Sequence, residues 1–374
     1  MFRVYAIPKT MRAVVYRGVN DLRLETVPVP RIGANELLVR VAVCGVCPTD
    51  IKKIHHGTVP PPRIFGHETA GTIVKLGSGV PVLGWKPGDR VALHHHVPCL
   101  DCHFCRHRAF AQCETYKRTG ITAGFEPAGG GYAEYVRVMP FVLRGVVKIP
   151  AKNSFEEGAM LEPVNTVLKA VRRLNLLRGD TVLVAGQGPI GLMFTRLLQL
   201  QGIRVLATDL LESRLRLAKK FGAKRAVLAS QLSTLNSQLD SAVIAVPSDS
   251  AVQQALQLVR GGGQVLLFAH TKRGSIAHPM EKGGSKPSAD KSHQPSTINP
   301  QLDLASICLD EKDLIGSYSS DFTLQRDVAR LVFSRQLNVR RLITHRFPLE
   351  QTATAVALAA NPKPDSLKIL VTQL

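Results

Sequence analysis

The sequence lacks the features that place a protein in or across a membrane. No run of about 18 apolar residues appears, so we expect no membrane-spanning helix. The first ten residues contain neither an apolar h-region nor a small-residue cleavage site, so we expect no secretory signal. We therefore expect a cytoplasmic protein. Six of its seven cysteines fall in two clusters, for which metal binding is favoured over disulfides.

Acidic and aromatic residues are also scarce. Asp and Glu total 28 against 48 Lys and Arg, which gives a formal net charge of +20, and aromatic residues make up 5% of the chain. A strongly basic chain suggests nucleic-acid binding. The basic residues are spread along the sequence without a dense block, however, and few aromatics lie among them, so we expect no specific nucleic-acid partner.

The length of 374 residues suggests about two to three domains. The pattern of predicted secondary structure also changes along the chain. From Met11 to about residue 150 it reads as short strands, such as 37–43 and 71–76, separated by Pro and Gly. A helix is predicted at 156–174, and strands then alternate with helices. These are strands at 181–185, 204–208, 241–246 and 264–268 and helices at 189–200 and 212–221. Such alternation predicts a parallel, doubly wound sheet.

Two segments fall outside this pattern. Residues 1–10 precede the better-patterned segment that Met11 opens and are interpreted as an extension. Residues 272–300 are polar, rich in Gly, Ser and Pro, and without periodicity, so a disordered surface insertion is predicted there.

A glycine-rich loop lies between a predicted strand and a predicted helix. Gly186, Gly188 and Gly191 permit a tight turn, a close backbone approach to a pyrophosphate, and close helix–strand packing. The N-terminus of the following helix offers free N–H groups to phosphates. Asp209 ends the next strand, where its carboxylate would accept hydrogen bonds from ribose hydroxyls and repel a 2′-phosphate. The pattern predicts NAD binding; an α/β domain without a nucleotide is the alternative.

Four cysteines are spaced for one metal ion. Cys99, Cys102, Cys105 and Cys113 are separated by two, two and seven residues. Thiolates this close together can surround a tetrahedral ion, so a structural zinc site is predicted.

A second candidate metal set lies upstream. Cys47 follows a predicted strand, and His67 and Glu68 begin another. A thiolate, an imidazole and a carboxylate suit a catalytic zinc with an open fourth position. Each residue alone would more often be part of a core; the neighbouring cysteines and glycine loop favour the metal interpretation.

Together these motifs identify a resemblance. The chain resembles the zinc-dependent medium-chain dehydrogenases, the superfamily of alcohol, polyol and threonine dehydrogenases. The motifs are 45–50, 66–68, 88–91, the four cysteines, 130–135, 161–163, the glycine loop and Asp209. The resemblance implies an α/β plus β fold. A GroES-like catalytic domain from 1–163 and 319–374 would enclose an inserted Rossmann domain, 164–318.

The resemblance also implies roles around the catalytic zinc. Cys47 and His67 match the first two ligands, and the third is either Glu162 or Glu68, a choice that the sequence leaves open. Thr49 matches the residue whose hydroxyl takes the substrate proton. Asp50 matches a carboxylate that orients the ligands.

Further matches concern the cofactor and the proton path. Thr166 corresponds to a residue beside the nicotinamide ring, and Arg214 to one beside the adenosine ribose. Pro189 and Ile190 complete the glycine loop. Lys52 occupies the position of a relay histidine in many relatives, so Lys52, His55, His56 or water would pass the proton outward.

A histidine run is the last sequence signal. His95 and His96 occupy positions that line the substrate pocket in relatives and suit a polar substrate; a solvated histidine cluster is the alternative.

Taken together, the motifs and the resemblance lead us to expect a homodimeric or homotetrameric enzyme with one catalytic and one structural zinc. It would pass hydride from a polyol, sugar alcohol or hydroxy-amino acid to NAD.

Other functions are weighed beside this one. A simple-alcohol dehydrogenase or a carbonyl reductase of the same superfamily is one alternative. A zinc-free quinone or enoyl reductase is disfavoured because such relatives generally lack both metal sets. A zinc-bearing nucleic-acid-binding or scaffold protein is the non-enzymatic alternative.

Overall fold

The computed structural model describes residues 6–80, 84–94, 97–118, 129–234, 238–269 and 303–373. His95, His96 and the expected insertion at 272–300 lie outside these residues, as do the first five of the expected extension. The described chain forms two compact units. The first contains 1–173, 188–200 and 318–374, and the second contains 174–187 and 201–317.

The first unit is built on a seven-stranded sheet. In spatial order its strands are β14 (Ile343–Pro348), β15 (Lys368–Thr372), β3 (Leu37–Gly45), β4 (Glu68–Leu76), β5 (Arg90–Leu93) and β7 (Val147–Lys148), with β6 (Tyr135–Val138) also paired to β3. β15 runs antiparallel to β3, so segments far apart in sequence are joined at the centre of this sheet.

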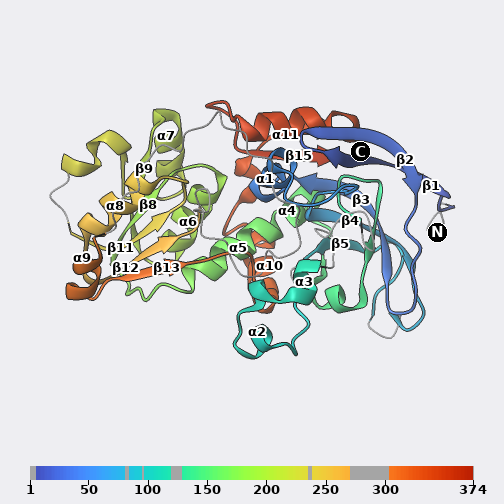
Figure 1. Cartoon of the computed structure of the whole chain (residues 1–374), viewed down its shortest axis with the longest axis horizontal. Helices are drawn as coiled ribbons and strands as arrows, with labels where there is room; N and C mark the ends of the chain where they lie inside the picture. Colours follow the sequence, from blue (N-terminus) through green and yellow to red (C-terminus); the bar gives the residue numbers. More distant parts are fainter. Residues whose placement is uncertain are drawn as a thin grey trace, which may run out of the picture. The chain divides into compact units, whose positions relative to one another are not determined.

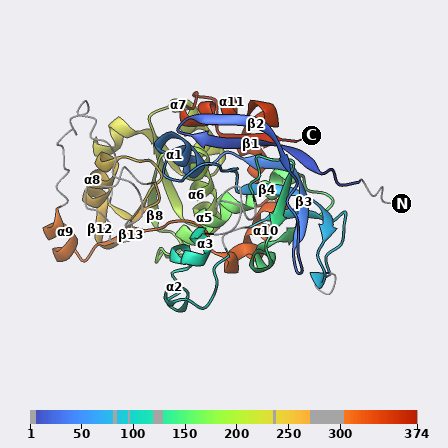
Figure 2. The ribbon, with the colours of Figure 1, turned by 45° about the vertical axis from the view of Figure 1, so that its right-hand side comes forward.

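An antiparallel pair, β1 (Thr10–Gly18) and β2 (Asp21–Pro28), belongs to the same unit. Its inner residues share a core with α11 (Thr352–Ala360), and the two lie side by side in Figures 1 and 2. The other helices of this unit are α1 (Pro48–His56), α2 (His103–Arg106), α3 (Glu114–Arg118), α4 (Phe155–Ala159), α5 (Leu161–Val171), α6 (Pro189–Leu200) and α10 (Gln325–Phe333).

The helical segment predicted at 156–174 is largely confirmed, but it consists of two helices, α4 and α5, which meet at Met160. α4 begins with a capping box in which Ser154 and Glu157 satisfy each other's backbone N–H. Pro163 lies in the first turn of α5, where its missing N–H costs nothing; inside one continuous helix it would remove a hydrogen bond and clash with the preceding turn.

The second unit contains a six-stranded, all-parallel sheet (Figure 1). Its spatial order is β10 (Arg225–Leu228), β9 (Arg204–Asp209), β8 (Thr181–Ala185), β11 (Leu239–Ile244), β12 (Val259–Leu267) and β13 (Asp313–Gly316). Numbered from β8, this is the 3-2-1-4-5-6 order of a doubly wound dinucleotide fold, which confirms the predicted fold class.

The elements predicted from residue 181 onward are confirmed, with shifted ends. β12 starts at Val259 rather than at residue 264 because its first half contains Gly261, Gly262 and Gly263, which hide the strand pattern. The remaining helices of this unit are α7 (Glu212–Lys220), α8 (Asp249–Leu258) and α9 (Leu304–Leu309). None of the helices in the described ranges is long and apolar enough to cross a bilayer.

Candidate functional site

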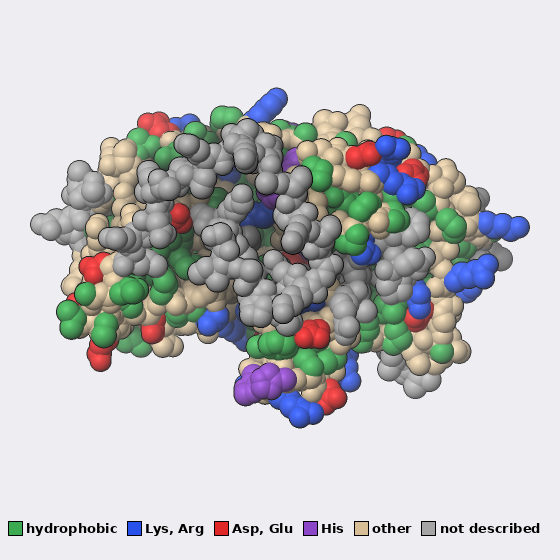
Figure 3. Space-filling model, viewed as in Figure 1, with side chains coloured by type: hydrophobic (Ala, Val, Ile, Leu, Met, Phe, Trp, Pro, Cys, Tyr) green, Lys and Arg blue, Asp and Glu red, His purple; other side chains and the backbone are tan. Residues whose placement is uncertain are grey.

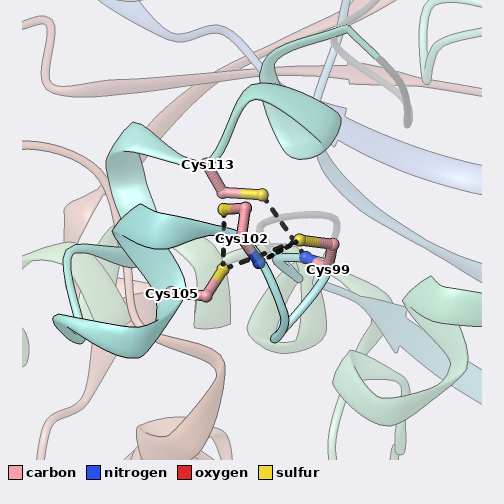
Figure 4. A group of neighbouring side chains, drawn as sticks. All are labelled: Cys99, Cys102, Cys105 and Cys113. Carbon is pink, nitrogen blue, oxygen red and sulfur yellow. Dashed lines mark hydrogen bonds between the residues drawn. The ribbon is translucent and has the colours of Figure 1, made fainter.

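The four spaced cysteines converge on one point, as Figure 4 shows. Their sulfur atoms all lie within 4.8 Å of one another. The Cys102 and Cys105 sulfurs are 3.5 Å apart, and those of Cys99 and Cys105 are 3.8 Å apart. Four sulfurs around a zinc ion at about 2.3 Å would be roughly 3.8 Å apart, so the spacing fits a tetrahedral zinc site. It is far too long for a disulfide, and all four thiols are free.

The local backbone favours negative charge at this cluster. Hydrogen bonds from the backbone N–H groups of Asp101 and Cys102 lower the pKa of Cys99 to about 6. Burial, reinforced by Cys102, raises the pKa of Cys105 to about 12. Cys99 therefore ionises readily whereas Cys105 resists ionisation, and a divalent cation bound at the cluster would stabilise both thiolates.

The outer surface of this lobe is polar. Asp101 and Arg106 pair there with side chains 89% and 73% exposed. Histidine side chains gather at the lobe's tip in Figure 3, where His103 and His107 of the α2 segment are exposed and their ring centroids lie 4.5 Å apart. The lobe thus buries Cys105 and Cys113 and presents charged and polar side chains on its surface beside the exposed Leu100.

The second candidate set is also brought together. One ligand atom each from Cys47, His67 and Glu68 lies within 4.8 Å of the others. Cys47 is the N-cap residue of α1, where the positive end of the helix dipole faces any negative charge. His67 precedes β4 and Glu68 is its first residue, so a helix start and a strand start hold the three groups.

Asp50 orients the His67 ring. His67 Nδ1 lies 3.1 Å from Asp50 Oδ1 within a fully buried pair, which leaves Nε2 for a metal. Burial opposes the charged form of His67, but Asp50 and Cys47 outweigh it and hold its pKa well above the usual range. Surroundings that favour a proton on His67 favour a metal cation in the same place.

Glu68 is paired on its other side with Lys368 of β15. Both side chains are buried; Lys368 Nζ donates to Glu68 Oε1 at 2.6 Å and to the Val46 carbonyl at 2.9 Å. Gly45 leaves room for the carboxylate, since a Cβ there would lie 1.9 Å from Glu68 Oε2.

Glu162 is the second buried carboxylate of this region. It lies in the first turn of α5, outside the compact set that contains Glu68. Burial raises the pKa of Glu162 to about 7; His67 and Lys368 lower it, while Glu68 and Asp50 raise it further. Because all these charges act on it, Glu162 belongs to the same electrostatic cluster, and the choice of third ligand stays between the two carboxylates.

The predicted proton-handling residues lie along α1. Thr49 is half-buried in its first turn, and Lys52 is exposed one turn later. Partial burial lowers the pKa of Lys52, and the nearby Cys47 partly offsets this. His55 contacts the Asn20 side chain, and His56 is exposed at the end of the helix. Their roles as a proton path remain predictions.

The glycine loop has the expected backbone form. Gly186 follows β8 with φ +90°, and a Cβ there would lie 2.3 Å from Val246 Cγ1, so only glycine fits. Gly188 precedes α6, whose first residues are Pro189, Ile190 and Gly191. Pro189 suits a first helical position.

Asp209 is held in place by backbone donors. Its Oδ2 accepts from Gln187 N at 2.6 Å and its Oδ1 from Leu211 N at 3.0 Å. Arg214 is buried on α7. Thr166, on α5, donates its hydroxyl to the Pro163 carbonyl at 2.8 Å. Their contacts with a cofactor remain predictions.

Sequence reasoning missed Lys368 and Tyr116. Lys368 lies 300 residues from Glu68 and carries no motif. The one available signal was a lysine that begins a buried strand, a position where a charge needs a partner. Tyr116, three residues after Cys113, belongs to no motif that the sequence shows.

Two family models match the chain. A model of the alcohol dehydrogenase GroES-like domain matches residues 33–151, and a model of zinc-binding dehydrogenases matches residues 189–287. The sorbitol dehydrogenase of Bombyx mori is 30% identical over 376 residues, covering 96% of this chain and 97% of that protein. The sorbitol dehydrogenase of Bacillus subtilis is 28% identical and covers 98% of both.

Solved structures agree. A zinc-binding dehydrogenase of Sinorhizobium meliloti, bound to NADP, superposes with a TM-score of 0.81 at 25% identity, covering 98% of this chain and all of that one. The two metal sets, the doubly wound sheet and these matches lead to one conclusion. The chain belongs to the zinc-dependent medium-chain alcohol and polyol dehydrogenases, oxidoreductases that act on CH–OH donors.

Proposed function

We propose that this chain oxidises a secondary hydroxyl of a polyol, sugar alcohol or hydroxy-amino acid to a ketone, with NAD as hydride acceptor. The observation that carries the proposal is the convergence of the half-buried Cys47 with the buried His67 and Glu68, with Asp50 hydrogen-bonded to the histidine. The sorbitol dehydrogenases at about 30% identity favour a polyol over a simple alcohol.

The residues around the site have distinct tasks. Zinc would be held by Cys47, His67 and a carboxylate from Glu68 or Glu162. When bound, zinc supplies an electrophile for the alcohol oxygen, and the nicotinamide supplies the acceptor for hydride. Asp50 favours the tautomer of His67 that carries its proton on Nδ1, so that Nε2 can serve as the metal ligand. The Thr49 hydroxyl would receive the substrate's proton.

The proton would leave along α1. Thr49, Lys52 and His56 are spaced three and four residues apart, which places them on one face of the helix. Lys52 and His56 are exposed, so this face ends in solvent.

NAD is favoured over NADP because of Asp209. Its carboxylate is fixed by two backbone donors at the end of β9, where ribose hydroxyls bind in this fold. A 2′-phosphate would meet a fixed negative charge. We also propose a cytoplasmic homodimer or homotetramer, which light scattering after size-exclusion chromatography would test.

The test is NADH formation by the zinc-loaded protein with polyols, hydroxy-amino acids and simple alcohols. Oxidation of one polar class, abolished by chelator and by Cys47→Ser, is the expected result. Preference for simple alcohols would support the alternative within the family. If no class is oxidised although zinc and NADH bind, the proposed substrates are wrong.

A further inference from the structure

One short segment of the first unit touches both the cysteine lobe and the helix that carries Glu162. We call this segment, residues 318–322, the strap. The chain passes from the second unit into the first at Tyr318, so the strap begins the returning part of the catalytic unit. The contacts that join it to the cysteine lobe and to α5 lie within the first unit.

The cysteine lobe holds the strap through two aromatic side chains. Tyr116 packs with Cys105 and Cys113, and its hydroxyl lies 3.2 Å from Ser319 Oγ. Phe110 also packs on the cysteine cluster, and its ring meets that of Phe322 edge-on at 5.5 Å. These two contacts join the lobe directly to the strap.

α5 holds the strap from its own side. The fully buried Asn165 amide donates to the Asp321 carbonyl at 2.9 Å and accepts from Asp321 N at 2.8 Å. Lys169, one turn later on α5, donates to the Tyr318 carbonyl at 2.8 Å. The strap is thus hydrogen-bonded to α5 at two backbone positions, three residues apart.

A third contact fixes the middle of the strap. Ser320 Oγ lies 3.4 Å from Nε2 of the buried His94, which follows β5. Burial lowers the pKa of His94 to about 3, so this ring is neutral near pH 7. The strap therefore has no freedom to shift at one end without moving its other partners.

α5 carries the residues that matter for the reaction. Asn165 lies three residues after Glu162 and directly before Thr166 on the same helix. Because a helix moves as a rigid element, a displacement at Asn165 moves Glu162 and Thr166 with it. A misplacement of about 1 Å in a catalytic group can cost a hundredfold in rate.

We propose that the cysteine lobe positions the catalytic helix: through Tyr116 and the strap it fixes α5, and with it Glu162 and Thr166. Tyr116 is then a positioning residue. The effect on rate rests on the proposed function, whereas the mechanical link from lobe to helix does not.

The experiment uses the zinc-loaded full chain and removes the two hydroxyl groups of the link one at a time. Tyr116→Phe keeps the ring on the cysteines and loses only the hydroxyl. Ser319→Gly removes the partner, and glycine tolerates the φ of +61° found there. Tyr135→Phe, a half-buried tyrosine of β6 in the same unit, is the matched control.

Three quantities are measured for each variant: zinc per chain, hydrogen–deuterium exchange of the 161–171 peptide without substrate, and kcat and KM with NAD and the best polyol. We expect two zinc ions per chain throughout. In Tyr116→Phe and Ser319→Gly the α5 peptide should exchange roughly fivefold faster, the equivalent of one lost neutral hydrogen bond, and kcat should fall at least as much. The double variant should be no worse than the more impaired single variant.

Unchanged exchange of α5 in both single variants, or equal changes in Tyr135→Phe, would overturn the inference. Faster exchange in the strap alone would also overturn it, because the link would then end before the helix. If the wild type oxidises no polyol but α5 exchange still responds to Tyr116→Phe, the proposed substrate fails and the positioning role stands.

Discussion

We expect Lys368→Met to lower the free energy of unfolding of the first unit more than a single substitution at the surface of that unit would. The substitution leaves the buried Glu68 carboxylate and the Val46 carbonyl without their shared ammonium donor, whose side chain is 6% exposed. Removing one partner of a buried ion pair typically costs about 3–5 kcal/mol. Methionine nearly conserves the volume of lysine, so the loss would come from the charge rather than from a cavity.

The chain offers a local probe for this measurement. Its one tryptophan, Trp85, lies in the first unit, where the ammonium of Lys148 is 5.4 Å from its ring centroid. Urea unfolding followed by tryptophan fluorescence therefore reports on the unit that contains Lys368. Adding Glu68→Gln to Lys368→Met removes the stranded charge, so the double variant should recover roughly 2 kcal/mol or more relative to additivity.

The double-mutant cycle of Lys368→Met and Glu68→Gln is measured once with excess zinc and once with chelator, because Glu68 is also a candidate zinc ligand. The coupling should persist with chelator, since it joins two side chains. Additive losses in the chelated protein would refute the reasoning.

The same pair predicts a pH dependence. Burial lowers the pKa of Lys368, but Glu68, Cys47 and Glu162 outweigh burial and leave it raised. A lysine with a raised folded-state pKa stabilises fully below its unfolded pKa of about 10.4 and loses that contribution as pH rises through the folded value. The difference in free energy of unfolding between wild type and Lys368→Met should be constant from pH 7 to 9 and should become smaller only in stronger alkali.

Further predictions concern the metals and the cofactor. If Glu68 is the third ligand, Glu68→Gln should reduce catalytic-site zinc, measured by metal analysis, more than Glu162→Gln; the reverse order would select Glu162. Cys113→Ser should leave one zinc per chain; two retained ions would contradict the lobe assignment. Asp209→Ser should raise kcat/KM for NADP relative to NAD by roughly tenfold, because it removes a charge worth about 1.4 kcal/mol against the 2′-phosphate. An unchanged ratio would show that another group sets the preference.

Local spacing made much of the molecule predictable. The gaps among Cys99, Cys102, Cys105 and Cys113 are short enough for one loop to close around an ion, so sequence alone implied their convergence. The strand, glycine turn and helix from 181 to 200 follow one another directly, and their order fixed the type of sheet.

The rest depended on distant parts of the chain. The partner of Glu68 comes from a strand that only the folded sheet brings beside β3, so no spacing reveals Lys368. The third ligand stayed open because Glu68 and Glu162 are both buried carboxylates from separate parts of the chain, so no spacing in the sequence tells which of them approaches Cys47 and His67. The break at Met160 followed from Pro163, which a purely periodic reading passes over.

The antiparallel pairing of β15 with β3 has a consequence for biosynthesis. Residues 368–372 must leave the ribosome before the central sheet of the first unit can close and before Glu68 meets its counter-charge. Until then the nascent chain carries an unpaired glutamate and an open strand edge, which leaves it exposed to chaperones and proteases. Loss of β15 alone would remove both a central strand of this sheet and the lysine that neutralises Glu68. A chain without this strand should therefore lose its fold, and not only its activity.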